Sequence, residues 1–405
     1  MAESLCSSYH LVGGTLLFHS QGWVCMDYFK RRLLWAIPAI VLFSSHTATA
    51  EVKSTVNPTI ITKTVLPESF GLLEASAQYR IEYPSTDGVK GTGSRIDTAA
   101  VFLPKGPTPP GGWPIVAWAH GTVGVAHDCA PSLNPRTARD NQYLNTWLSL
   151  GYAIVAPDYA GLGSEGLHHY LNARAEAWSS LDSIKAAQKI FPLKNEIILV
   201  GQSQGAHAAF ASAGYQAEYA PELNINGTVL TGTPYFNENS SAAKILSPMK
   251  HDDKAITGDP KIPYIFYIFL SEAAKNPQLK AEDYFQGKAL PLLARANELC
   301  ITPLTEEVMK QKLTVENSLK PSIQNILISA KGALQYPTLK IDHPVFIGIG
   351  EADINVPTAM QKQFATDVKA AGTQAEVHFY PGLDHSGTVN PSLRDSVPFV
   401  LSRKE

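Results

Sequence analysis

The chain has 405 residues, of which 44% are hydrophobic and 17% are charged, and its formal net charge at pH 7 is −3. This balance indicates a globular protein with a large core and argues against a disordered chain. A nearly neutral chain without a basic cluster gives no electrostatic reason to expect nucleic-acid binding. The length allows two domains of average size or one large domain.

Residues 26–50 have the composition of a secretory signal peptide. Three basic residues, Lys30–Arg32, precede a short apolar stretch at Leu33–Phe43, and Ala48–Ala50 form a small-residue cleavage site. The apolar stretch is too short to span a bilayer. We therefore expect export and cleavage after Ala50. A buried N-terminal helix is the alternative.

Residues 1–25 precede this complete signal, where they have no evident role. We therefore expect Met26 to be the true start and residues 1–25 to be a mis-assigned extension.

Two of the four cysteines remain after such processing. Cys6 and Cys25 lie in the part expected to be removed, whereas Cys129 and Cys300 lie in the mature chain. Two cysteines in an exported protein favour one disulfide. Two buried free thiols are the alternative.

The first elements of the mature chain are predicted to be antiparallel. Residues 51–75 are expected to be an irregular lead-in. Residues 79–83 and 96–103 alternate in polarity and carry β-branched and aromatic side chains, and a turn at 85–88 separates them. We expect an antiparallel pair at the start of a sheet.

Short continuous apolar runs then alternate with segments of helical spacing. The apolar runs are typical of strands buried on both faces of a parallel sheet. They lie at 114–118, 152–156, 197–200, 228–230, 345–349 and 377–380, and the helical segments lie at 141–150, 174–190, 205–219 and 358–371. This alternation predicts βαβ crossovers and a three-layer α/β core.

Residues 235–340 are too long to be an ordinary connection between two core strands. They contain helical patterns at 283–298 and 304–313 and a nearly continuous apolar run at 262–270. We expect an inserted cap over the carboxyl edge of the sheet, where open α/β sheets bind ligands. The apolar run is equally compatible with the cap's own core. The core would then comprise residues 51–234 and 341–405.

The sequence Gly201-Gln202-Ser203-Gln204-Gly205 lies between a predicted strand and a predicted helix. In that context the G-x-S-x-G pattern predicts a nucleophile elbow, a turn so tight that larger flanking residues would collide with the strand and the helix. The serine hydroxyl would project beside a helix N-terminus, where amide groups favour developing negative charge.

A nucleophilic serine needs a base and an orienting acid, expected here in the order serine, acid, histidine. Asp353 and His385 follow two later predicted strands in that order. The rivals are His378 for the base, and Glu351 and Asp384 for the acid. We favour Asp353 and His385 because His378 lies inside a predicted strand and Asp384 is adjacent to His385.

Two backbone amides should stabilise the oxyanion of the reaction. The first is predicted to come from Gln204, directly after the nucleophile. The second is predicted to come from Thr122, in the loop after the first long parallel strand. No metal or other cofactor is needed for this chemistry.

Other polar residues have more ordinary interpretations. His168 and His169 form a pair without the partner spacing of a metal site, and Asp158 is expected to brace a loop. His207 lies one helical turn after Ser203, and core packing is the favoured role.

These motifs resemble those of the secretory lipases of the α/β-hydrolase superfamily, which include fungal lipase A enzymes and bacterial relatives. The resemblance spans roughly residues 70–400 and rests on GQSQG, GEADINVP, GLDHSG, WAHGT and PDYAGLG, with a DCAPS segment that contains Cys129. It implies an α/β-hydrolase fold and places Cys300 in the cap, where the family's disulfide partner lies. Lipase A enzymes carry an acidic residue near the oxyanion position, where this chain has Thr122.

The resemblance implies hydrolysis of carboxylic esters in lipid catabolism, often of triacylglycerols, with a cap that shapes an acyl tunnel. The implied partner is an ester or lipid substrate, with transient contact with lipid interfaces and no stable protein partner. An acyltransferase or peptidase on the same triad is the alternative within enzymes. An inactive protein that binds an apolar ligand is the alternative outside them.

Overall fold

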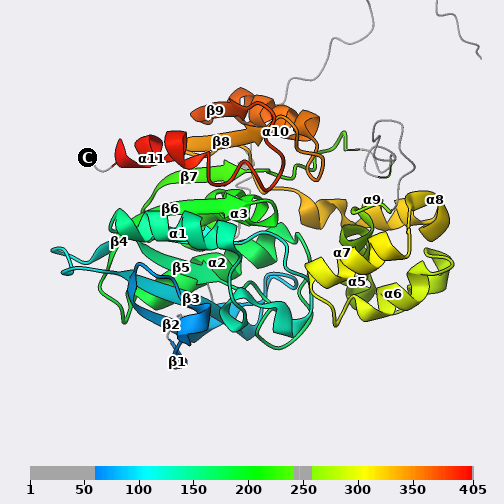
Figure 1. Cartoon of the computed structure of the whole chain (residues 1–405), viewed down its shortest axis with the longest axis horizontal. Coiled ribbons are helices and arrows are strands. Elements are labelled where there is room, and N and C mark those ends of the chain that lie inside the picture. The colour runs from blue at the N-terminus through cyan, green and yellow to red at the C-terminus, as the bar shows by residue number, and fades with distance from the viewer. Residues whose placement is uncertain (1–59, 241–245, 247–257, 404–405) are drawn as a thin grey trace, which may run out of the picture. The chain divides into compact units, whose positions relative to one another are not determined.

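The computed structural model of the chain describes residues 60–240, 246 and 258–403 (Figure 1). The predicted signal peptide and residues 1–25 lie outside the described residues. No helix within the described ranges is long and apolar enough to cross a membrane.

Nine strands of the described chain form one mixed sheet in the order β1-β2-β3-β5-β4-β6-β7-β8-β9. The strands are β1 (Thr62–Val65), β2 (Ala75–Thr86), β3 (Ser94–Pro104), β4 (Trp113–Ala119), β5 (Ala153–Pro157), β6 (Leu193–Gln202), β7 (Ile225–Thr231), β8 (Val345–Gly350) and β9 (Ala375–Tyr380). From β1 to β5 the neighbouring strands are antiparallel, and from β5 to β9 they are parallel. All six predicted parallel runs therefore correspond to strands, and the expected α/β class is confirmed.

Helices cover both faces of the sheet (Figure 1). The helices around the sheet are α1 (Ala138–Ser149), α2 (Ala173–Gln188), α3 (Gln204–Tyr219), α10 (Thr358–Ala370) and α11 (Leu393–Leu401). Helices α1 and α11 share one hydrophobic cluster with the sheet, and α2, α3 and α10 share the other. Because both faces are covered, the central strands are apolar throughout, which is why they appear in the sequence as continuous runs.

The irregular lead-in predicted for residues 51–75 is wrong over part of its length. Residues Thr62–Val65 form β1, which pairs antiparallel with β2 at the edge of the sheet. All four side chains of β1 are exposed, so the strand has no buried face to produce an alternating pattern. The turn predicted at 85–88 also begins later than expected, because β2 continues through Thr86.

Five further α-helices lie between β7 and β8 in the described residues. They are α5 (Ile262–Lys275), α6 (Ala289–Arg295), α7 (Ile301–Lys310), α8 (Val315–Ser318) and α9 (Ile323–Leu334). Their apolar side chains form a separate cluster, to which the run at 262–270 contributes Ile265, Phe266 and Phe269. This run therefore forms part of the core of these inserted helices, which we call the cap after the role expected for them.

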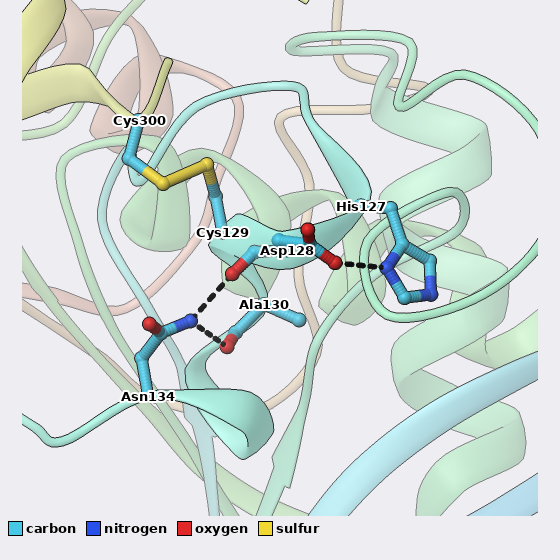
Figure 2. The surroundings of a disulfide bond; sticks show 6 residues. All are labelled: His127, Asp128, Cys129, Ala130, Asn134 and Cys300. Atoms are coloured by element: carbon cyan, nitrogen blue, oxygen red, sulfur yellow. Dashed lines mark hydrogen bonds and ion pairs between the residues drawn. A yellow bond between two sulfur atoms is a disulfide. The ribbon is translucent and has the colours of Figure 1, made fainter. Parts of the chain in front are cut away.

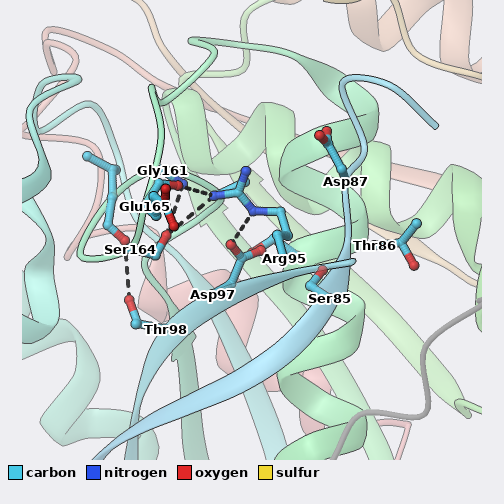
Figure 3. Close-up of polar contacts among 12 residues, drawn as sticks. Ser85, Thr86, Asp87, Arg95, Asp97, Thr98, Gly161, Ser164 and Glu165 are labelled. Carbon is cyan, nitrogen blue, oxygen red and sulfur yellow. Dashed lines mark hydrogen bonds and ion pairs between the residues drawn. The ribbon is translucent and has the colours of Figure 1, made fainter. Parts of the chain in front are cut away.

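Arg95 on β3 forms an ion pair with Asp97 of the same strand and a hydrogen bond to the loop after β5 (Figure 3). Arg95 Nε donates to Asp97 Oδ1 at 2.6 Å, and Arg95 Nη2 donates to the carbonyl oxygen of Glu165 at 3.0 Å. The side chain of Asp97 is fully buried, and this burial raises its pKa while the charge of Arg95 offsets part of the rise.

We expect Arg95→Met to lower the free energy of unfolding by about 3 kcal/mol at pH 7, because a buried carboxylate loses its partner. Because the pKa of Asp97 is raised in the folded state, the free energy of unfolding falls as pH rises above about 3.9, the pKa of aspartate in the unfolded chain. Without Arg95 the pKa of folded Asp97 rises further. The free energy of unfolding lost through Arg95→Met should therefore be small near pH 4 and grow toward pH 7. Urea unfolding at both pH values measures this, and equal losses at both would contradict it.

Candidate active site

Ser203 lies at the turn between β6 and α3. Its backbone φ of 59° lies in a region that residues other than glycine rarely adopt. A side chain at position 201 would collide with the backbone of Gly205, and one at position 205 would collide with the carbonyl oxygen of Ala119. Ser203 itself is anchored by its N–H, which donates to the carbonyl oxygen of Thr231 at 2.9 Å. The sequence therefore forms the strained turn that the G-x-S-x-G pattern predicts.

Asp353 and His385 follow β8 and β9, and the structure brings them together. His385 Nδ1 lies 2.7 Å from Asp353 Oδ2. The other carboxylate oxygen of Asp353 accepts from the N–H groups of Asn355 and Val356, each at 3.0 Å. Gln361 Nε2 also donates to Oδ2 at 2.8 Å. The carboxylate is thus held from several sides and can fix the orientation of the imidazole ring.

The rival residues have other partners. Glu351 forms an ion pair with Lys362 at 3.2 Å. Asp384 accepts from the N–H of Gly387 at 2.6 Å, within its own turn. His378 Nε2 lies 2.7 Å from the carboxylate of Glu376, on the same strand. None of these three contacts joins a rival to the pair of Asp353 and His385.

Gln202, the residue before Ser203, was not identified from the sequence as part of this site. Its Nε2 lies 3.0 Å from His385 Nε2, the ring nitrogen that a serine would use as a base. Gln202 Oε1 accepts from Arg139 at 3.5 Å, and Arg139 also donates to the hydroxyl of Ser386 at 3.0 Å. This orientation points the amide nitrogen of Gln202 at the ring. The sequence feature that could have indicated Gln202 was its polar side chain at the end of a buried strand.

Among the described residues, no hydrogen bond from the Ser203 hydroxyl is present. The Nε2 lone pair of His385 accepts from Gln202 instead. Hydrogen bonds between catalytic groups often tighten only when substrate binds.

Thr122 lies in the loop after β4, as predicted, but its side chain has a partner that the sequence did not indicate. Its hydroxyl lies 2.8 Å from the hydroxyl of Tyr170. Burial raises the pKa of Tyr170 well above its usual value, so this hydroxyl stays protonated. The Tyr170 ring packs against Tyr264 and Tyr267 of α5, with centroids 6.2 Å and 5.5 Å apart. The loop that contains Thr122 is thereby connected to the cap.

Cys129 and Cys300 form a disulfide, as expected (Figure 2). Cys300 directly precedes α7, whereas Cys129 lies in a short turn beyond the Thr122 loop. Asn134 braces this turn by donating to the carbonyl oxygens of Asp128 and Ala130, at 2.7 and 2.9 Å (Figure 2). The bond therefore attaches the cap covalently to the loops beside Ser203.

Asp158 braces a loop, as predicted. It accepts from the hydroxyl of Thr98 at 2.7 Å and from the N–H of Ser132 at 2.8 Å. Within the residues that the structure describes, no group of three or more His, Cys, Asp or Glu side chains could hold a metal ion.

The strand order, the helices on both faces and the serine at the β6–α3 turn define an α/β-hydrolase. The secretory lipase family model matches residues 133–380. The chain belongs to the secretory lipase family, which confirms the resemblance found in the sequence.

Two fungal relatives are each less than 30% identical to this chain. Lipase A of Moesziomyces aphidis is 29% identical over 188 residues, which cover 43% of this chain and 39% of that protein. A secreted triacylglycerol lipase of Malassezia furfur is 28% identical over 196 residues, covering 44% of this chain and 46% of that protein. These alignments span less than half the length of either relative.

A solved structure of Candida antarctica lipase A in its closed state has a TM-score of 0.67 at 20% identity. The superposition covers 85% of this chain and 81% of that chain. At this identity the similarity establishes the shared fold.

Proposed function

We propose that the chain is an exported serine hydrolase that cleaves carboxylic esters. The observation that carries the proposal is the 2.7 Å contact between Asp353 and His385 beside the strained turn of Ser203. Two residues near that turn lie against the ring of His385, which supports the proposal. Gln202 contacts its Nε2, and a side chain on Gly232 would collide with its ring.

In this mechanism, His385 Nε2 takes the proton from the Ser203 hydroxyl while the oxygen attacks the ester carbonyl. Asp353 holds Nδ1–H, so that Nε2 carries the lone pair. The backbone N–H groups of Gln204 and Thr122 stabilise the negative oxygen of the tetrahedral intermediate. Collapse of the intermediate expels the alcohol, which takes its proton from His385. Water then attacks the acyl-enzyme and releases the acid.

We further propose lipid esters as substrates and the cell exterior as the site of action. The family is named for secretion, and the matched relative from Malassezia furfur is a triacylglycerol lipase. Ile354, directly after Asp353, exposes 48% of its surface. An exposed apolar side chain beside the site suits transient contact with a lipid interface.

The test combines labelling with a substrate series. A fluorophosphonate probe should label Ser203, and p-nitrophenyl esters of increasing chain length should be hydrolysed, with the preferred length defining the substrate class. Absence of labelling at Ser203 would favour a binding protein without catalysis. Faster release of nitrophenol with an added alcohol, together with a new ester product, would indicate an acyltransferase.

A further inference from the structure

Beneath Ser203, on the side of α2, lies a buried polar cluster that the proposed mechanism does not use. Its members are Glu176, His168, Gln204 and His207, and none exposes more than 1% of its surface. Buried polar groups are costly unless their hydrogen bonds are satisfied. All side-chain polar atoms of these four residues except Gln204 Oε1 have a hydrogen-bond partner, and these partners indicate what the cluster does.

The amide group of Gln204 is held at both hydrogens. Its Nε2 lies 2.7 Å from Glu176 Oε1 and 2.7 Å from His168 Nε2. His168 Nδ1 lies 3.0 Å from the carbonyl oxygen of Ala160, so Nδ1 carries the proton and Nε2 accepts. Burial lowers the pKa of His168 to about 4, which keeps the ring neutral for this role.

Glu176 has partners on both carboxylate oxygens. Besides Gln204, Oε1 accepts from the N–H of Leu171 at 3.1 Å. Oε2 lies 3.1 Å from His207 Nδ1, and His207 Nε2 donates to the carbonyl oxygen of Leu334 at 2.8 Å. Leu334 is the last residue of the cap helix α9. One carboxylate therefore connects the residue after the nucleophile to the end of a cap helix.

We propose that Glu176 is a positioning residue for the oxyanion site. It fixes the side chain of Gln204, and through His207 it fixes the end of α9 relative to Gln204. Gln204 is the residue whose backbone N–H is assigned to the oxyanion, so fixing its side chain restricts rotation of the first turn of α3. The inference rests on the proposed function, because it concerns the same transition state. Misplacement of a reacting group by about 1 Å can lower a rate by about 100-fold.

The central variant is Glu176→Met, which keeps the length of the side chain and removes every acceptor. With a soluble p-nitrophenyl ester, kcat per fluorophosphonate-labelled site should fall about 10- to 100-fold, while KM changes less than about threefold. The affinity for a boronic acid that mimics the tetrahedral intermediate should fall by a similar factor. A purely structural role would lower the labelled fraction and leave both quantities unchanged.

Glu176→Gln should rescue most of the activity. Its amide oxygen can still accept from Gln204 and Leu171, and its amide nitrogen keeps a polar group within reach of His207 Nδ1. Retention of wild-type kcat in Glu176→Met would overturn the inference. An equal loss in Glu176→Gln would also overturn it, because the charge rather than the hydrogen bonds would then be responsible.

Asp182→Leu is the matched control. Asp182 is a fully buried carboxylate on the same helix, but its partners are Ser85, Tyr219 and Lys185, at 2.9, 2.6 and 2.8 Å. This change should lower stability and leave kcat per labelled site unchanged. If the control lost kcat as Glu176→Met does, the effect would be general destabilisation and the inference would fail.

If Glu176→Met does not fold, Gln204→Met tests the same contact from the other end and leaves the pair of Glu176 and His207 intact. It should show the 10- to 100-fold loss of kcat expected for Glu176→Met. Full kcat in Gln204→Met would overturn the inference. Failure to label wild-type Ser203 would overturn the proposed function itself, and this inference with it.

Discussion

Replacing Ser203 by alanine is expected to lower turnover of a p-nitrophenyl ester by about a millionfold. The change removes the oxygen that attacks the ester and leaves His385 without a proton to accept. The fold should persist, because the elbow is held by Gly201, Gly205 and the backbone bond from residue 203 to Thr231. Steady-state kinetics and a thermal melt measure the two effects separately.

Ser212→Ala is a matched control for this change. Ser212 is buried on the same helix α3, and its hydroxyl donates to the carbonyl oxygen of Ala208 at 2.7 Å. Loss of this bond should leave turnover within a few-fold of the wild type. If Ser203→Ala retained ester hydrolysis, the nucleophile would have to be another group and the proposed mechanism would be wrong.

Asp353→Asn should lower kcat by about 10,000-fold. Asp353 Oδ2 accepts from both His385 Nδ1 and Gln361 Nε2, and its Oδ1 accepts from two backbone N–H groups. An asparagine must turn its NH₂ group toward one of these pairs of donors. Turned toward His385, the amide favours the tautomer with the proton on Nε2, which cannot accept from Ser203.

The control for this change is Asp367→Asn. Asp367 accepts from Tyr235 and Gln363 on α10, at 2.8 and 2.7 Å, and contacts neither Ser203 nor His385. The Asp367→Asn variant should have the kcat of the wild type. A loss of less than tenfold in Asp353→Asn would mean that another acid orients the base, and Glu351→Gln would then be the next variant to measure.

The placement of Ser203, Asp353 and His385 could be predicted because each follows a strand in the parallel part of the sheet. Successive parallel strands bring such residues to one edge of the sheet, so chain order alone limits the candidates. The roles of these residues stay predictions until they are tested, and the same holds for the amides of Gln204 and Thr122. The edge strand β1 was missed because it has no buried face.

The contacts of Gln202 and Glu176 could not be predicted, for a different reason. Each joins segments distant in the sequence, since Gln202 meets His385 and Glu176 connects Gln204 to Leu334 through His207. A glutamate within a helix is usually a solvated residue. Only the packing of α2 against the sheet, α3 and α9 makes this one a buried carboxylate.

The disulfide between Cys129 and Cys300 closes a covalent ring that contains Ser203 but excludes Asp353 and His385. A single proteolytic cut anywhere between the two cysteines would open this ring without separating the fragments. Ser203 and His385 would stay on one covalently linked molecule, and after a cut between Ser203 and Cys300 reduction would release them as two polypeptides. If the chain is exported as proposed and is cut there by a protease, this connectivity would let the nicked chain keep Ser203, Asp353 and His385 together.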